Sequence, residues 1–171
     1  VRAGELVAQQ GKIWKEDIAP ALARAGLPVF AREDLDARAL RRVKTIFTSE
    51  IFPVLTPLAI GPVQPFPYIS GLSLNMGATV TDPKTEESRF ARVKLTPGLP
   101  RFLPVPGGVV PTEQIVAAEL ARVFPGMEVT DTTLFRVTRD ADFSVSDEAD
   151  DLLGAVEAQL HSRRFGDVVR L

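Results

Sequence analysis

Four arginines in the last quarter of the chain are the side chains best suited to phosphate chemistry. They stand in two pairs, Arg136 with Arg139 and Arg163 with Arg164. A guanidinium group stays charged in any environment and binds phosphate oxygens through two parallel hydrogen bonds. The two pairs would form one anion site only if their segments meet in the fold. Salt bridges to neighbouring aspartates are the alternative role of these arginines.

Two other polar groups are weaker candidates for binding. Asn75 lies among small uncharged residues on the polar face of a predicted strand, where it would line a cleft or simply face solvent. A basic group on a predicted helix is more typical of a solvated helix face than of a polyanion site. It comprises Arg38, Arg41, Arg42 and Lys44.

His161 is the only histidine of the chain and the only candidate for covalent phosphate chemistry. A nucleophilic histidine needs an orienting carboxylate and phosphate-binding donors around it. His161 instead ends a predicted helix, where the helix dipole favours a histidine that has no catalytic role. We therefore predict no catalytic residue in this chain.

No metal site is predicted either. Asp140 and Asp142 could hold Mg²⁺ with a nucleotide, but capping of an Asx turn before the next helix explains the pair more simply. Cysteine is absent, which excludes disulfides and thiolate metal sites and makes a reducing cytosol the default compartment. The glycine-containing stretch at residues 106–109 lacks the Lys and Ser or Thr of a phosphate-cradling loop.

The composition is close to that of an average soluble globular protein. The chain has 171 residues, of which 45% are hydrophobic and 25% charged, and its net charge is −2. This length suits one domain, or one domain with a fragment of another. The net charge gives no overall footprint for nucleic acid, and no apolar run approaches the ~20 residues of a membrane span. Because residues 1–4 contain neither a methionine nor a signal peptide, we expect the chain to be cut from a longer protein.

Apolar periodicity predicts the elements that must position these side chains. Helices are predicted around residues 14–25, 36–51, 112–124 and 146–160. Strands are predicted at residues 72–81, 89–95, 101–105, 127–139 and 168–171. The first two strands should form an antiparallel hairpin, and helices mixed with such a hairpin indicate an α+β fold.

Several local features refine this assignment. Pro20 should kink the first helix, Gly26 should end it, and Thr112 should cap the third. The proline-rich stretch 50–67 should be neither helix nor central strand, although its apolar side chains must pack against something. In the strand at residues 72–81 one face should be buried and the other polar.

Blocks of sequence along nearly the whole chain resemble bacterial polyphosphate kinase, of the type that is phosphorylated on a histidine. The blocks fall in the family's order at Trp14–Leu22, Ile51–Leu58, Pro65–Ser70, Leu72–Asn75, Phe90–Lys94, Leu99–Phe102, Phe135–Asp142 and Arg163–Gly166. Two positions depart from the family pattern. Gln64 stands where the family usually has His, and Gly71 where it usually has Asn, so any polar role at these positions is in doubt.

The resemblance implies a domain organisation. Residues 1–50 would be the end of an N-terminal helical domain with its connecting helix. Residues 51–171 would be the middle, or head, domain, with the next domain starting at the extreme C-terminus. In this family the head domain is α+β, with packed helices on a mixed sheet, and is similar to phosphohistidine phosphatases.

The resemblance also implies a reaction, the reversible transfer of the ATP γ-phosphate to inorganic polyphosphate through a phosphohistidine. ATP and Mg²⁺ would serve the parent enzyme, and no cofactor is expected in this fragment. The reactive histidine would lie beyond Leu171, so the fragment should be inactive alone. It should contribute to self-association, as a dimer or higher oligomer, and to the walls of a substrate tunnel. The parent protein should be cytoplasmic, or at most peripheral at the membrane. The polyphosphate- or nucleotide-binding candidates remain Arg136, Arg139, Arg163, Arg164 and Asn75.

Two alternatives stay open. The arginines would also suit a stand-alone module that binds a polyanion or nucleic acid, although the acidic charge and the few aromatic residues argue against nucleic acid. A phosphohistidine phosphatase is suggested by fold analogy alone and would depend on His161.

Overall fold

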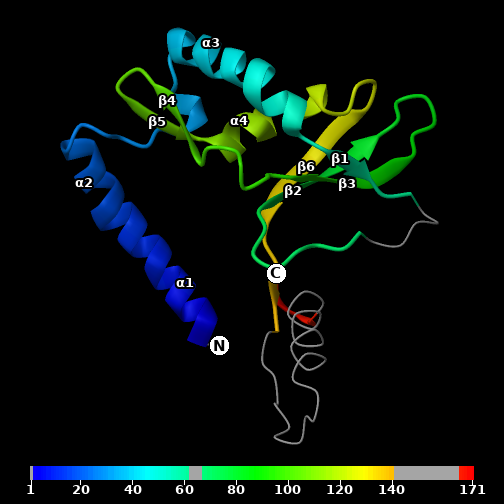
Figure 1. Cartoon of the computed structure of the whole chain (residues 1–171), viewed down its shortest axis with the longest axis horizontal. Helices are drawn as coiled ribbons and strands as arrows, with labels where there is room; N and C mark the ends of the chain where they lie inside the picture. The colour runs from blue at the N-terminus through cyan, green and yellow to red at the C-terminus, as the bar shows by residue number, and fades with distance from the viewer. Residues whose placement is uncertain (1, 62–66, 141–165) are drawn as a thin grey trace, which may run out of the picture. The chain divides into compact units, whose positions relative to one another are not determined.

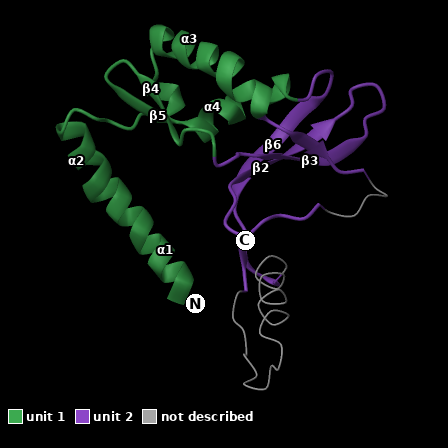
Figure 2. Ribbon diagram, in the orientation of Figure 1, with its two compact units in different colours: residues 1–54, 98–123 green, residues 55–97, 124–171 purple. Residues whose placement is uncertain are grey.

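The computed structural model describes residues 2–61, 67–140 and 166–171 (Figure 1). They form two compact units, each built from segments that are distant in the sequence (Figure 2). Unit 1 comprises Val1–Val54 and Gly98–Val123, and unit 2 comprises Leu55–Pro97 and Phe124–Leu171. The predicted helix around residues 146–160 lies outside the described residues, together with Gln64, Asp142, His161, Arg163 and Arg164.

Unit 1 begins with one long helix in three parts, which starts earlier than predicted. These parts are α1 (Arg2–Ile13), the π-helical turn η1 (Trp14–Ile18) and α2 (Ala19–Arg24). The backbone amide of Ala19 donates to Trp14 O five residues back, and Pro20 follows at the start of α2. A π turn is one way to accommodate a proline, which has no amide to donate. Gly26 ends the helix with a φ of 81°, as predicted.

The second helix of unit 1 buries one face, in keeping with the apolar periodicity that predicts it. It consists of α3 (Ala37–Ile46), the π-helical turn η3 (Phe47–Ile51) and the 3-10 turn η4 (Phe52–Val54). Asp36 caps it by accepting a 2.7 Å hydrogen bond from the amide of Ala39. Val43, Phe47 and Ile51 are buried, and each such side chain contributes about 1.5–3 kcal/mol through the hydrophobic effect. The basic group on this helix faces outward, as expected.

Two expectations about helices were wrong. The proline-rich stretch does contain a helical turn, because Pro53 lies within η4, where a single turn needs few backbone donors. Thr112 begins a helix but does not cap it, since Pro111 is the N-cap residue. The hydroxyl of the buried Thr112 donates instead to the carbonyl oxygen of Pro100.

The rest of unit 1 is a hairpin and a short helix. The 3-10 turn η2 (Arg32–Asp34) precedes α3, and the later segment contains β4 (Phe102–Val105), β5 (Gly108–Pro111), α4 (Thr112–Ala118) and the 3-10 turn η5 (Leu120–Arg122). β4 and β5 pair antiparallel, and an isolated parallel bridge joins Val29 to Val109. This bridge brings the backbone so close that a Cβ on Gly108 would lie 2.3 Å from Pro28 O.

Arg122 joins the two segments of unit 1. Its guanidinium group lies over the rings of Phe47 and Phe52, 5.3 and 5.6 Å from their centroids. It also donates a 3.0 Å hydrogen bond to the hydroxyl of Thr48. These cation–π contacts and the hydrogen bond hold η5 against the end of the α3 helix.

Unit 2 is built on an antiparallel sheet with the strand order β1-β3-β2-β6 (Figure 1). The strands are β1 (Pro57–Ala59), β2 (Asn75–Thr81), β3 (Ser88–Lys94) and β6 (Glu128–Phe135). The predicted hairpin is confirmed, with β2 and β3 in register from Asn75 opposite Lys94 to Thr81 opposite Ser88. β1 lies at the edge of the sheet, as a strand that begins with a proline must.

The strand β2 differs from its prediction in length and in burial. It begins at Asn75 rather than at residue 72, and Leu72 is exposed in a turn with a φ of 59°. The face that carries Asn75 is not solvated, because the rings of Phe90 and Phe135 close over Gly77 on that face. A Cβ on Gly77 would lie 2.9 Å from the Phe90 ring.

A third pairing completes unit 2, between β7 (Thr138–Arg139) and β8 (Val168–Arg170). Helices packed with antiparallel sheets confirm the α+β class. Within the described ranges every strand-to-strand pairing is antiparallel, and the isolated Val29–Val109 bridge is parallel. No helix in these ranges is both long enough and apolar enough to cross a membrane.

Candidate anion-binding site

Three cations of unit 2 converge on the loop that precedes β2. Each binds a different one of three successive loop residues, Tyr68, Ile69 and Ser70. We call Arg92, Lys94 and Arg139 the cation cluster.

Arg92 lies deepest of the three, with only 9% of its surface exposed. It projects from β3, donating from Nη1 to Tyr68 O at 3.0 Å and from Nε to the Oδ1 atom of Asn75 at 2.9 Å. Both acceptors are neutral, so neither offsets the charge. Burial lowers the pKa of Arg92 from its ordinary value, because desolvation disfavours the charged form.

Asn75, a predicted binding residue, is fully buried beneath this site. Its Nδ2 atom donates to the carbonyl oxygen of Ser73 at 2.8 Å and to the Ser73 hydroxyl at 3.0 Å. With its amide group fixed in this way, Oδ1 points to Arg92 and orients the guanidinium group. The observed contacts of Asn75 therefore position an arginine, and direct binding of a ligand by Asn75 stays a prediction.

Lys94 ends β3 directly opposite Asn75 in the sheet. Its Nζ atom donates to the hydroxyl of Ser70 at 3.1 Å, and the side chain is half-buried. Ser70 is itself held in place, because its carbonyl oxygen accepts a 2.7 Å hydrogen bond from the hydroxyl of Ser73.

Arg139 reaches the same loop from β7. Its Nε atom donates to Ile69 O at 3.0 Å and its Nη1 atom to Gly166 O at 2.7 Å. The guanidinium group also stacks on Tyr68, 4.6 Å from the ring centroid. This predicted site residue thus lies in the cluster.

The cation cluster has no acidic counterpart in the part of the chain that the structure describes. The ion pairs found there join Lys12 to Glu16, Arg89 to Glu87, Arg101 to Glu113 and Arg122 to Glu119. None of them involves a member of the cluster. Three positive charges thus share one loop with neutral hydrogen-bond acceptors only, an arrangement that favours an anionic ligand.

The other predicted arginines are placed less fully. Arg136 is exposed and follows directly on Phe135, which pairs with Asn75, so it lies at the same end of the sheet as the cluster. Arg163 and Arg164 fall outside the described residues, and whether they join this site stays a prediction.

Sequence reasoning missed Arg92 and Lys94. They alternate with Ala91 and Val93 in the predicted strand, which is typical of a solvent-facing pair. The available signal was the hairpin register, which puts Lys94 on the same face as Asn75.

Metal binding finds no support in residues 2–61, 67–140 and 166–171. They contain no group of three or more His, Cys, Asp or Glu side chains that could hold an ion. We assign no step of Mg²⁺ chemistry to the side chains of this part of the chain.

Comparison with known proteins identifies the family. A protein-family model described as "Polyphosphate kinase middle domain" matches residues 39–171. The chain belongs to the polyphosphate kinase family. The resemblance of the sequence blocks is therefore confirmed.

Individual polyphosphate kinases match nearly all of this chain. The polyphosphate kinase of Streptomyces coelicolor is 48% identical over 172 residues, which cover 99% of this chain and 23% of that protein. That of Synechocystis sp. is 46% identical over 181 residues, covering 97% and 25%. The crystal structure of polyphosphate kinase from Porphyromonas gingivalis superimposes with a TM-score of 0.70 at 25% identity, covering 93% of this chain and 27% of that one.

The chain spans about a quarter of the length of these curated polyphosphate kinases. The family match starts within α3, at Ala39. The predicted domain boundary after residue 50 stays a prediction, as does the role of each candidate residue in a polyphosphate kinase.

Proposed function

We propose that this chain is the middle part of a polyphosphate kinase, which transfers the ATP γ-phosphate reversibly to inorganic polyphosphate. The observation that carries the proposal is the match of residues 39–171 to the middle domain of that family. Relatives that bear this name align with almost the whole chain. The cation cluster supports the proposal independently, because it offers positive charge to a phosphate polymer.

Within the complete enzyme, this part forms walls of the tunnel that holds polymer or nucleotide, and it contributes to self-association. It does not carry the phosphorylated histidine. The relatives are about four times as long as this chain, which leaves most of their residues to hold the catalytic groups, ATP and Mg²⁺. The protein acts in the cytoplasm.

The test is phosphate transfer by the complete protein and by residues 1–171 alone. The complete protein, supplied with ATP and Mg²⁺, should form acid-insoluble polyphosphate, and with ADP and polyphosphate it should form ATP. Residues 1–171 should do neither, although they should bind polyphosphate. A complete protein that forms neither product would contradict the proposed reaction. Phosphate transfer by residues 1–171 alone would contradict the proposal that the catalytic groups lie in the rest of the enzyme.

The alternative is a stand-alone polyanion-binding module, which the cation cluster would also suit. The two functions differ in what the complete protein does, because a binding module leaves ATP unchanged. The same assay therefore separates them.

A further inference from the structure

We infer that the loop at residues 67–73, together with Arg92, Lys94 and Arg139, is a binding site for the inorganic polyphosphate chain. The choice of ligand rests on the proposed function, whereas the anionic class of the ligand follows from the cluster itself. The site differs from the predicted arginine set, because two of its three cations lie on β3.

The first argument is the balance of charge. The three cations donate to Tyr68, Ile69 and Ser70 in turn, all through neutral acceptors. Positive charges gathered around one loop repel each other, and a buried charge without a counterion is costly. Residues 2–61, 67–140 and 166–171 supply no carboxylate within ion-pair distance of the cluster. A polymer with a negative charge on every unit would supply several counterions at once.

The second argument is the supply of free donors. A guanidinium group has five N–H groups and an ammonium group has three. Arg92 and Arg139 each use Nε and Nη1, and Lys94 uses one donor on Ser70. The Nη2 groups of both arginines and the other ammonium donors have no acceptor among the described residues. Phosphate oxygens are acceptors of the right charge for them.

The third argument is access from solvent. Lys94 and Ser70 are half-buried, and Gly71 and Leu72 beside them are exposed. The loop surface that carries the cluster is therefore open at Lys94, with Arg92 beneath it. An anion can reach Lys94 without any rearrangement of the sheet.

The fourth argument is that the cations are already held in place. Asn75 fixes Arg92 and is fixed in turn by Ser73, while the ring of Tyr68 supports Arg139. Side chains ordered in advance lose little entropy when a ligand binds. This distinguishes the cluster from lysines and arginines on an open helix face.

The chemistry favours polyphosphate over single-stranded nucleic acid. Proteins that bind single strands without sequence preference stack the bases on aromatic side chains along a basic groove. In this loop the aromatic ring is that of Tyr68, and the guanidinium group of Arg139 already stacks on it. The rings of Phe90 and Phe135 on the same sheet face pack against Gly77. A phosphate chain has no base to stack and needs closely spaced cations alone.

Lys94→Gln in the complete protein is the decisive variant, because Lys94 is half-buried and uses only one of its donors on the loop. Affinity for polyphosphate of defined chain length should fall about tenfold when one charged contact is lost. The slope of log K against log salt should become shallower by about one, since one phosphate contact is missing. Lys94→Arg should keep most of the affinity. Isothermal titration at several salt concentrations measures all of these values.

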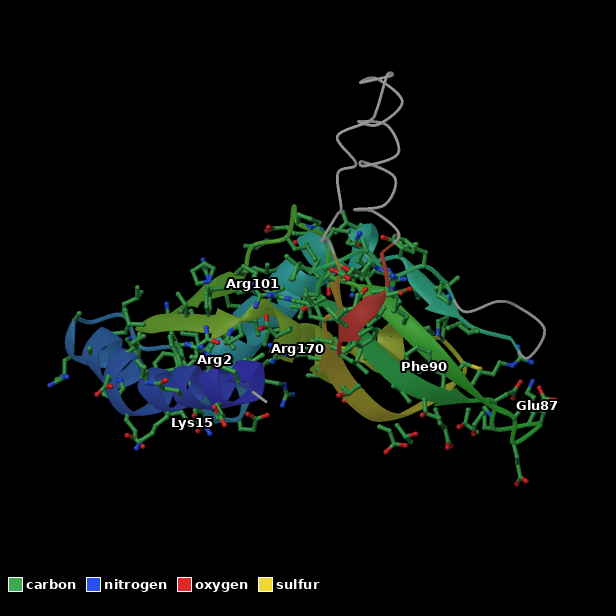
Figure 3. The ribbon with its side chains drawn as sticks, turned by 90° about the horizontal axis from the view of Figure 1, so that it is seen from below. Arg2, Lys15, Glu87, Phe90, Arg101 and Arg170 are labelled. Carbon is green, nitrogen blue, oxygen red and sulfur yellow. The ribbon has the colours of Figure 1, made fainter. Side chains whose placement is uncertain are left out.

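Arg89→Gln is the matched control. It removes the same charge from the same strand, but Arg89 forms an ion pair with Glu87 near the hairpin turn. Figure 3 shows Glu87 at that turn, with Phe90 further along β3. Affinity and salt slope should stay at the wild-type values. Thermal unfolding of each variant should show that both remain folded.

Two results would overturn the inference. In the first, folded Lys94→Gln binds polyphosphate as tightly and with the same salt slope as Arg89→Gln. In the second, single-stranded RNA of the same charge displaces polyphosphate from the wild-type protein as well as polyphosphate itself does, and Lys94→Gln lowers the affinity for both polymers by the same factor. That result would indicate a general polyanion surface. Either result leaves the phosphate-transfer assay unaffected, so failure of this site and failure of the proposed function are distinguishable.

Discussion

At the residue scale, the central feature is a buried arginine whose hydrogen-bond acceptors among the described residues are uncharged. Arg92 donates to Asn75 and Tyr68, and Asn75 is held by Ser73. Replacing a buried charge by an apolar residue would avoid the cost of desolvation. Arg92 holds the loop through its hydrogen bond to Tyr68 O.

Asn75→Ala should destabilise the protein by about 2 kcal/mol, because it leaves a buried charged donor of Arg92 without its acceptor. Ser73→Ala is the control, since Arg92 keeps both acceptors in that variant. It should cost less, about 1 kcal/mol. Urea unfolding of the two variants measures the difference. Equal losses of unfolding free energy in the two variants would show that Asn75 does not hold Arg92 in place.

At the element scale, close backbone contacts hold unit 1 together. The bridge between Val29 and Val109 links the residues before α3 to the β4–β5 hairpin, and it depends on Gly108. Arg122 makes a second link by stacking on Phe47 and Phe52. Both links join the two sequence segments of the unit.

Gly108→Ala should destabilise unit 1 by about 1–3 kcal/mol, because the new Cβ would lie 2.3 Å from Pro28 O and backbone atoms cannot easily move aside. Gly98→Ala is the control within the same unit, where an added Cβ meets nothing within 4 Å. It should be neutral or slightly stabilising, by up to about 1 kcal/mol. Thermal unfolding compares the two. If Gly108→Ala left the thermal stability unchanged, the bridge between Val29 and Val109 would not contribute to the stability of unit 1.

At the scale of the whole molecule, two units are each assembled from two separate segments, so neither unit corresponds to a continuous half of the sequence. The first helix of unit 1 leaves large apolar side chains exposed. They include Leu6, Val7, Ile13, Trp14 and Ile18. Exposed apolar surface of this kind promotes association and competes with any interface made by the middle domain.

Self-association through the middle domain predicts that residues 1–171 form a dimer or a higher oligomer in sedimentation experiments. The double variant Leu6→Glu/Trp14→Glu separates the two surfaces, because it makes the exposed helix polar and leaves unit 2 unchanged. The oligomer should persist in this variant. A wild-type monomer, or an oligomer that the double variant abolishes, would contradict association through the middle domain.

The sequence by itself determined the features that depend on neighbouring residues. The helix end at Gly26 and the β2–β3 hairpin follow from a left-handed glycine and from alternation over short distances. The ordered sequence blocks also identified the family. Local rules failed at Pro53, which lies within a 3-10 turn, and at Thr112, whose hydroxyl donates to the carbonyl oxygen of Pro100 instead of capping α4.

Only the tertiary structure decided the candidate site. Arg92 and Asn75 are separated by 17 positions, and Arg139 is 70 positions from Ile69. Periodicity can show which residues share a strand face, but not whether a loop covers that face. Here the loop at residues 67–73 and the rings over Gly77 bury it, and a pattern typical of solvent exposure becomes a set of buried and half-buried cations.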